Sequence, residues 1–333
     1  AKQFNEMFVL NPKHARAHIN GDIHIHDMDF LTLTTTCCQI DLIKLFAGGF
    51  STGHGVLREP NSISIYAALA CIAIQSNQND QHGGQAIPNF DYSMAPGVAK
   101  SYLKHFYHNL AKAITLLVKL DGEDIATKVK GEMRLKPTLD KNEAFEEQLK
   151  ETLKANKVDK FVDEIVEFAI TSAYEETDRE TYQAMEAFIH NLNTMHSRAG
   201  AQVPFSSINY GMDTSSEGRM VMRNILLATE AGLGHGETPI FPIQIFRVKE
   251  GINYNEGEPN YDLFKLACRT SAKRLFPNFS FVDAPFNKQY YKGTPETEIA
   301  YMGCRTRVMG NVYAPDKEIS FGRGNLSFTS INL

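Results

Sequence analysis

Apolar positions along the chain recur at two spacings, which predict a mixture of helices and strands. Residues 99–117 place Tyr102, Phe106, Leu110, Ala113 and Leu117 on one face at helical spacing. The same spacing recurs over residues 145–153, 161–168 and 182–192. The most apolar run, residues 63–74, has about half of the ~20 residues that a membrane-spanning helix requires. We therefore interpret it as a buried core helix.

Alternating and β-branched stretches lie between the predicted helices. Residues 20–46 alternate polar and apolar positions, which predicts strand and loop structure. Further strand-like stretches occupy residues 202–210, 239–248, 279–284, 305–314 and 325–333. Strands that alternate with helices, without a long linker, predict a single α/β domain over residues 1–333. Periodicity alone leaves open whether the sheet is open or closes into a barrel.

Composition narrows the class of protein. The 333-residue chain is 43% hydrophobic and 22% charged, and its formal net charge is −5. This balance argues against binding nucleic acid or membranes through bulk electrostatics. The N-terminus lacks the charged and apolar regions of a secretory signal. Five cysteines, an odd number in a large chain, favour a reducing compartment over a disulfide framework, so we expect a cytoplasmic protein.

Two cysteine motifs are candidates for chemistry. Cys37 and Cys38 are adjacent in TTTCCQIDL, and neighbouring side chains on a strand point to opposite faces. One sulfur can then face a cavity while the other packs, although two buried small hydrophobes are the commoner explanation for such residues. Cys304, in YMGCRTRVMGN, follows Gly303 and precedes two arginines that either lower the pKa of its thiol or face solvent. The local pattern favours neither a functional nor a structural interpretation of Cys304.

His24 and His26 form the one metal-like pattern in the sequence. An x-spaced pair on a strand places both imidazoles on one face. No downstream His or Cys pair completes a set of ligands, so structural histidines beside a pocket are the better interpretation. We expect this chain to hold no metal.

Nine segments, taken in order, resemble one enzyme family. They are GDIHIHDMDF, TTTCCQIDL, GFSTGHGVLREP, AIQSNQNDQHGGQAIPNFDYSMAPGV, NLNTMHSRAGAQVPFSSINYG, EGR, NFSFVDAPFN, YMGCRTRV and GRGNLSFTSINL. In this order and spacing they resemble the anaerobic (class III, glycyl-radical) ribonucleoside-triphosphate reductases. The resemblance extends from about Gly21 to Leu333, and YMGCRTRV and the NLNTMHSR segment are its most specific parts.

The resemblance implies a fold and a reaction. The fold is a ten-stranded α/β barrel of the type shared by ribonucleotide reductases and pyruvate formate-lyase, with a central finger loop, here truncated at its C-terminus. Cys304 matches the finger-loop cysteine, whose thiyl radical abstracts the 3′-hydrogen of the ribose. Either Cys37 or Cys38 supplies the proton with which the 2′-hydroxyl leaves as water, and we favour Cys37 because it directly follows the polar Thr36. Such chemistry makes deoxyribonucleotides for DNA replication.

Further positions match the formate-using branch of the family and its regulatory loop. Met302 and Asn325 stand where that branch lines its site, which implies formate as the reductant. The segment GAQVPFSSINYG resembles a loop that couples the substrate base to an allosteric effector at a dimer interface. The resemblance implies a homodimer with ribonucleoside triphosphate substrates and ATP or deoxyribonucleoside triphosphate effectors. Candidate loop or substrate residues are His26, Gln81, His82, Gly83, Gly84, Ser197, Arg198, Gly200 and Gln202.

The sequence also departs from the family pattern. An ATP-binding cone, a zinc-binding cysteine quartet and a glycyl-radical loop have no counterpart in it. The resemblance therefore implies that the structural zinc and the glycyl radical, which an iron–sulfur, S-adenosylmethionine-dependent activating enzyme generates, belong to further sequence. We expect the chain to be a fragment that is inactive by itself. The alternatives are a pyruvate formate-lyase type enzyme, a metallohydrolase at His24 and His26, and a non-catalytic nucleotide-binding module.

Overall fold

A six-stranded sheet forms the centre of the computed structural model, which describes residues 1–31, 34–197, 201–303, 306–308, 314 and 320–333. Five of its strands are parallel, in the order β2, β5, β6, β7 and β8, and β11 pairs antiparallel with β2. The strands are β2 (Cys37–Gln39), β5 (Gln85–Ile87), β6 (Ser206–Tyr210), β7 (Ile243–Val248), β8 (Asn278–Phe281) and β11 (Gly324–Asn325).

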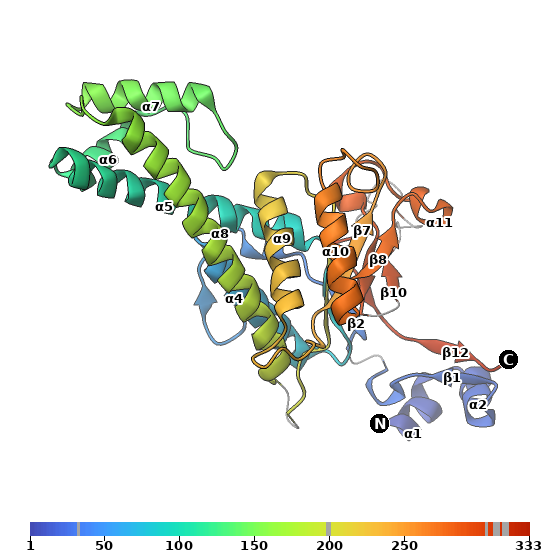
Figure 1. Cartoon of the computed structure of the whole chain (residues 1–333). Coiled ribbons are helices and arrows are strands. Elements are labelled where there is room, and N and C mark those ends of the chain that lie inside the picture. Colours follow the sequence, from blue (N-terminus) through green and yellow to red (C-terminus); the bar gives the residue numbers. More distant parts are fainter. Residues whose placement is uncertain (32–33, 198–200, 304–305, 309–313, 315–319) are drawn as a thin grey trace.

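Helices cover one face of this sheet. Figure 1 shows α4, α8, α9 and α10 along one side of the strands. Ile208, Tyr210 and Phe246 point to this side and share one buried apolar cluster with the helices. The helices are α4 (Ile63–Asp80), α5 (Phe90–Val118), α8 (Val162–Thr194), α9 (Ser216–Ala231) and α10 (Tyr261–Arg274). The apolar run at residues 63–74 is a buried helix, as predicted.

The opposite face of the sheet is polar and carries a hairpin. Because side chains alternate along a strand, Ser207, Asn209 and Arg247 point away from the helices. Cys37 lies on the same polar face, since it clusters with Ala86, the register partner of Ser207. The hairpin of β9 (Ala300–Met302) and β10 (Thr306–Val308) crosses this face, and β9 contacts β2, β5 and β6.

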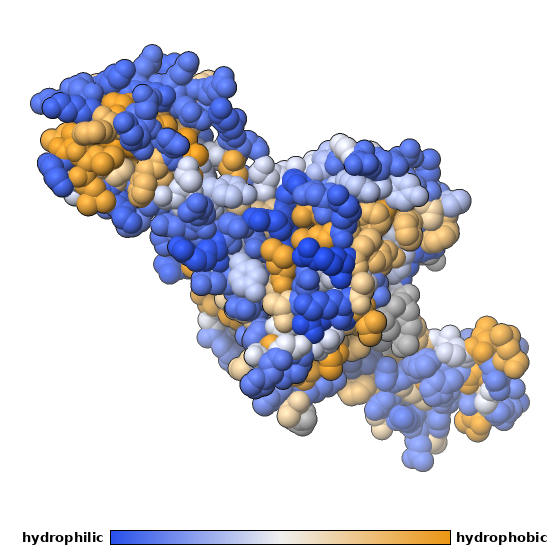
Figure 2. Space-filling view, in the orientation of Figure 1, coloured by the Kyte–Doolittle hydropathy of each residue, from blue (hydrophilic) through white to orange (hydrophobic). Residues whose placement is uncertain are grey.

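A second apolar core lies beyond the sheet, where α5 and α8 continue outward (Figure 1). There they pack against α6 (Gly122–Glu132) and α7 (Glu143–Ala155). Phe145, Leu149 and Leu153 are buried in this core, as their spacing predicted. Figure 2 shows apolar surface at this outer end, and Leu116 at the end of α5 is 55% exposed. The predicted helices at 161–168 and 182–192 are one continuous helix, α8.

Short elements complete the described chain. An N-terminal arm comprises α1 (Lys2–Phe4), η1 (Asn5–Val9), α2 (Pro12–Asn20) and β1 (Ile23–Ile25), and β1 pairs antiparallel with β12 (Thr329–Ile331). Both chain ends therefore lie near this arm (Figure 1). The remaining elements are η2 (Met28–Phe30), α3 (Leu42–Phe46), β3 (Phe50–Ser51), β4 (Val56–Leu57), α11 (Pro285–Lys288) and η3 (Pro295–Thr297). Among the described residues, no helix combines the length and apolar character needed to cross a bilayer.

The predicted α/β class is confirmed, but the expected ten-stranded barrel is not what the described residues form. In that part of the chain no strand pairs with the outer edge of β8 or β11, so the sheet stays open. The physical reason is that one set of parallel strands with a single antiparallel edge supplies only part of the hydrogen-bonding groups that closure requires. The prediction of a single domain over residues 1–333 stays a prediction.

Candidate active site

A cavity of about 670 Å³ lies at the polar face of the sheet, beside β2. Its lining comes from segments that are far apart in the sequence. Predicted residues among the lining are His26, Cys37, His82, Gly83, Gly84 and Gln202. Phe328 and Ser330 line it from the other end of the chain. A second cavity of about 670 Å³ lies among α5, α6 and α8 and contains none of the predicted residues.

The two adjacent cysteines face different surroundings. Cys37 is buried and lines the cavity, and its Sγ accepts a hydrogen bond from the Gly84 N–H at 3.2 Å. Cys38 points toward α4, where Asn77 donates to its Sγ at 2.9 Å and the thiol donates to Gln85 Oε1 at 3.6 Å. Burial raises the pKa of the Cys38 thiol to about 11. The predicted alternation of the two side chains is confirmed, and the sulfur that reaches the cavity is that of Cys37.

Two other predicted residues lie beside Cys37. Asn325 is its register partner across β2 and β11, and the Thr36 N–H donates to the Asn325 carbonyl at 2.7 Å. Met302 is buried in the small apolar cluster that contains Cys37. Cys304 lies outside the described residues. Its neighbours Met302 and Thr306 are register partners in the hairpin, and Thr306 lines the cavity.

Gly83 allows β2 to approach the QHGG segment. A Cβ at Gly83 would lie 1.0 Å from the Thr36 carbonyl oxygen and 2.9 Å from Cys37 Sγ. No side chain fits in that space, so only glycine permits this contact. The close approach also brings the N–H of Gly84 to the Cys37 sulfur.

The predicted residue His82 is held on several sides. Its ring stacks on Phe30 with centroids 4.8 Å apart, and its Nδ1 lies 2.7 Å from Thr34 Oγ1. Its Nε2 lies 3.9 Å from Asp27 Oδ2. These contacts fix the ring at the cavity wall, where it can donate or accept a hydrogen bond. The neighbouring Gln81 accepts a hydrogen bond from Thr35 at 2.7 Å.

His26 lies on the other side of the cavity, where its Nε2 is 2.8 Å from Ser330 Oγ. The rings of His24 and His26 are 4.6 Å apart, although β1 ends at Ile25 and His26 lies in the turn that follows. Among the described residues, no three His, Cys, Asp or Glu side chains are placed to hold one metal ion. The metallohydrolase alternative therefore has no ligand set in that part of the chain.

The predicted effector-loop residues are only partly described. Ser197 donates a hydrogen bond to Gln78, a residue of α4 that also lines the cavity. Gln202 lines the same cavity. Arg198 and Gly200 lie outside the described residues. The structure thus brings the described part of this loop to the cavity that holds Cys37.

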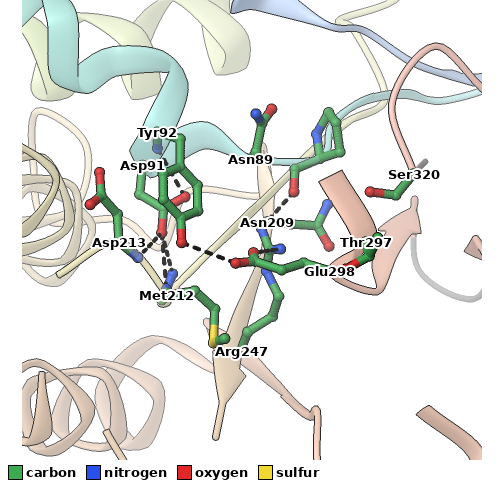
Figure 3. A network of polar contacts seen from close by, with 12 residues as sticks. Asn89, Asp91, Tyr92, Asn209, Met212, Asp213, Arg247, Thr297, Glu298 and Ser320 are labelled. Carbon is green, nitrogen blue, oxygen red and sulfur yellow. Dashed lines mark hydrogen bonds and ion pairs between the residues drawn. The ribbon is translucent and has the colours of Figure 1, made fainter. Parts of the chain in front are cut away.

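A buried polar network beside β9 was missed by the sequence reasoning (Figure 3). Arg247 is fully buried and forms an ion pair with Glu298, which is 1% exposed. A second Arg247 nitrogen donates to the Pro88 carbonyl at 2.5 Å, and Tyr92 donates to Glu298 at 3.0 Å. The signal was present as an arginine inside the apolar strand PIQIFRV. Buried charges need partners, and this arginine therefore required a buried carboxylate.

Asp91 and Asp213 extend this network toward α9. One oxygen of Asp91 accepts the backbone N–H groups of Gly211, Met212 and Asp213 at 2.9, 3.0 and 3.1 Å. Burial, together with the nearby charge of Asp91, raises the pKa of Asp213 to about 6. The carboxylate of Asp91 therefore holds the turn after β6, and the neighbouring Asp213 keeps its proton to a higher pH than an ordinary aspartate does.

The raised pKa of Asp213 predicts a loss of stability with rising pH. The folded protein holds this proton up to about pH 6, whereas the ordinary pKa is 3.8. The stabilisation is therefore complete below about pH 4 and lost as pH rises through 6, by up to about 3 kcal/mol. Asp213→Asn keeps the acceptor for the Ser215 N–H and is expected to flatten this dependence. Urea unfolding of both proteins between pH 4 and 7 measures it; identical pH profiles would contradict the assignment.

The family model of the anaerobic ribonucleoside-triphosphate reductases matches residues 1–333. This chain belongs to that family. The anaerobic ribonucleoside-triphosphate reductases of Enterobacteria phage T4 and Escherichia coli K12 are each 28% identical to this chain over 336 aligned residues. The match covers 100% of this chain, 45% of the phage reductase and 39% of the E. coli reductase. The chain therefore spans less than half of these family members.

Solved structures of this family are also similar to the chain. The anaerobic ribonucleotide reductase of Thermotoga maritima in complex with dATP and CTP matches with 12% identity and a TM-score of 0.48, over 85% of this chain and 39% of that one. The same enzyme with citrate in its active site matches with 14% identity and a TM-score of 0.48, over 88% and 45%.

Proposed function

We propose that the full-length protein containing this chain reduces ribonucleoside triphosphates to 2′-deoxyribonucleoside triphosphates by a thiyl-radical mechanism, with formate as the reductant. Membership of the reductase family supports the reaction. The proposed residue roles rest on one observation. Cys37, Met302 and Asn325 lie close together, although they come from segments up to about 290 residues apart in the sequence. A cavity of about 670 Å³ at that place suits a ligand of nucleotide size.

The proposed steps balance in atoms and electrons. A Cys304 thiyl radical takes the 3′-hydrogen of the ribose and returns it at the end. The Cys37 thiol protonates the departing 2′-hydroxyl, water leaves, and a proton from solvent restores the thiol. Formate is oxidised by two electrons to CO2 while C2′ is reduced by two, so one triphosphate, one formate and one proton give one deoxyribonucleoside triphosphate, CO2 and water. Loss of water through a proton donated in place is general acid catalysis.

The chain's own residues support this chemistry in distinct ways. Asn325 is neutral, so it can hydrogen-bond the ribose or formate without repelling the anion. Met302, which is 4% exposed, contributes apolar surface that keeps water from a radical intermediate. The hairpin of β9 and β10 lies on the sheet face as a finger loop would, and we propose that the barrel closes with strands of further sequence.

Nucleotides other than the substrate are proposed as effectors. The Thermotoga maritima anaerobic ribonucleotide reductase, one of the solved structures similar to this chain, forms a complex with dATP and CTP. The proposed loop that couples the substrate base to the effector contains Ser197, Arg198, Gly200 and Gln202. His26, Gln81 and His82 are proposed to border this loop or the substrate. We propose a cytoplasmic homodimer, a glycyl radical on further sequence installed by a radical S-adenosylmethionine activating enzyme, and a structural zinc outside this chain.

An isotope experiment tests the proposed reaction. The full-length protein, activated anaerobically by its activating enzyme, is given a ribonucleoside triphosphate and ¹⁴C-formate. We expect labelled CO2 and deoxyribonucleoside triphosphate in about equal amounts, as the balance requires. Protein that has not been activated is the control. Product formation without labelled CO2 would overturn formate as the reductant, and no product in the activated sample would overturn the reaction itself.

A further inference from the structure

Strand β6 carries polar side chains where a central strand is usually apolar. Its five residues, Ser206–Tyr210, are all fully buried. Ile208 and Tyr210 pack into the helical core, so Ser207 and Asn209 point to the opposite face, on which β9 lies. A buried amide or hydroxyl is unfavourable unless it is hydrogen-bonded. The partners of these two side chains therefore indicate what they are for.

Both side chains bind the backbone of the segment that leads to Cys304. Asn209 Oδ1 accepts the N–H of Tyr301 at 2.8 Å, and its Nδ2 donates to the Tyr301 carbonyl at 3.0 Å. The same Nδ2 donates to the Ile87 carbonyl of β5 at 3.1 Å. Ser207 Oγ accepts the N–H of Gly303 at 3.0 Å. Asn209 thus engages both polar groups of one β9 residue, as a neighbouring strand would.

These contacts leave little freedom to the three residues before Cys304. Asn209 holds Tyr301, Ser207 holds Gly303, and Met302 between them is buried in the cluster with Cys37. Gly303 adopts φ +60°, where an added Cβ would lie 3.0 Å from the ring of Phe205.

The same segment is also fixed at its start, where Glu298 forms its ion pair with Arg247. Figure 3 shows Asn209 and Arg247 pointing from adjacent strands toward the segment of Glu298. The sheet therefore binds the segment from Glu298 to Gly303 at both of its ends.

We propose that Asn209 is a positioning residue, which holds the backbone of Tyr301 and thereby sets where the Cys304 sulfur meets the substrate. The inference rests on the proposed function, because it assumes that Cys304 carries the reactive sulfur. Its mechanism is geometric, since a reacting atom displaced by about 1 Å can lose about 10²-fold in rate. Substrate affinity, which depends on other residues of the cavity, is left unchanged.

Three variants of the full-length protein test this role. Asn209→Ala removes both hydrogen bonds to the backbone of Tyr301. Asn209→Asp keeps the size of the side chain but places a carboxylate against the carbonyl oxygens of Tyr301 and Ile87. Ser207→Ala removes only the acceptor for Gly303 and leaves almost no cavity. The matched control is Asn224→Ala, because Asn224 is an equally buried amide whose partners, Asp178 and the Met220 carbonyl, lie among the helices. Each protein is compared for kcat, KM, glycyl-radical signal and thermal midpoint.

The expected result is a loss of kcat without a loss of binding. The Asn209 variants should lose at least about tenfold in kcat, with KM within about twofold of wild type and the radical signal retained. Ser207→Ala should show the same pattern more weakly. The Asn224→Ala control should keep kcat even if its midpoint falls as far. Asn209 variants that keep kcat, or a control that loses it equally, would overturn the proposal.

A second readout separates this inference from the proposed function. In protein that has not been activated, iodoacetamide labelling of Cys304 is followed by peptide mass spectrometry, with the exposed Cys268 as internal standard. Releasing the segment should raise the relative labelling rate of Cys304 by about fivefold or more in Asn209→Ala and leave it unchanged in Asn224→Ala. An unchanged rate in Asn209→Ala would contradict the positioning role of Asn209 even if the enzyme reduces nucleotides. A raised rate in a protein without reductase activity would support that role and contradict only the proposed nucleotide reduction.

Discussion

Replacing Cys37 by alanine in the full-length protein is expected to lower the rate of nucleotide reduction by about 10²–10⁴-fold, the range that loss of a positioned proton donor produces. The reason is geometric. Cys37 lines the cavity beside Met302 and Asn325, whereas Cys38 points toward α4 and bonds Asn77 and Gln85. The neighbouring variant Cys38→Ala is therefore the matched control. It should lose a little stability and keep its rate within about tenfold.

Initial rates of deoxyribonucleotide formation, normalised to the glycyl-radical content, measure both variants. The radical content must be similar, because neither cysteine is proposed to take part in activation. A third variant, Cys304→Ala, should give no product, since it removes the radical carrier itself. Equal losses in Cys37→Ala and Cys38→Ala, or a larger loss in Cys38→Ala, would show that the wrong sulfur has been assigned.

The second large effect is expected from a single added methyl group. Gly83→Ala would place a Cβ 1.0 Å from the Thr36 carbonyl oxygen, so the backbone of β2 or of the QHGG segment must move. Overpacking of a close contact destabilises proteins by about 1–3 kcal/mol or more, and this contact is with backbone, which cannot rotate away. We expect a loss of about 3 kcal/mol in the free energy of unfolding and, because Cys37 moves with Thr36, a loss of activity.

Gly131→Ala is the matched control for this substitution. Gly131 lies within α6, and an added Cβ there meets nothing within 4 Å. Alanine favours the helical state by about 0.5–1 kcal/mol relative to glycine, so this variant should be slightly more stable. Urea unfolding of the two variants and wild type gives both values. A Gly83→Ala protein as stable as wild type would mean that the close approach of the two segments is wrong.

The parts of the fold that follow from local periodicity could be predicted from the sequence. The buried helix over residues 63–74 and the buried row of Phe145, Leu149 and Leu153 both depend on neighbours within a few turns. The same is true of the opposite directions of Cys37 and Cys38. In each case the residue pattern within one segment determines its structure, and the rest of the molecule only supplies the apolar surface against which the segment packs.

The single helix α8 was predicted as two because its middle is polar. Thr177 and Thr181 are fully buried there, and their hydroxyls donate to the carbonyls of the residues four positions earlier, Ala173 and Thr177, at 2.6 and 2.7 Å. Each hydroxyl is thereby satisfied within the helix and can be buried. Such residues interrupt an apolar pattern without interrupting the helix. Phe161, predicted as helical, instead precedes the helix with φ +57°.

The candidate site came from resemblance rather than from periodicity. No local pattern could bring His26, Cys37 and Gln202 to one cavity, since that depends on how distant segments pair. The ion pair of Arg247 and Glu298 was missed for the same reason, because its partners are 51 positions apart. The ten-stranded barrel went beyond what the described chain supplies, since a sheet closes only when its last edge finds a partner.

The pairing of β2 with β11 has a consequence for the order in which the protein is assembled during synthesis. Thr36 donates a hydrogen bond to the carbonyl of Leu326, 290 positions later. A ribosome adding about 5–20 residues per second needs roughly 15–60 s to reach that partner. Until then the strand that bears Cys37 has an unpaired edge, while the helices behind it can already form. The cavity that Cys37 lines therefore forms only after the segments of the helical core have been synthesised, and until then the free edge of β2 can pair with other chains.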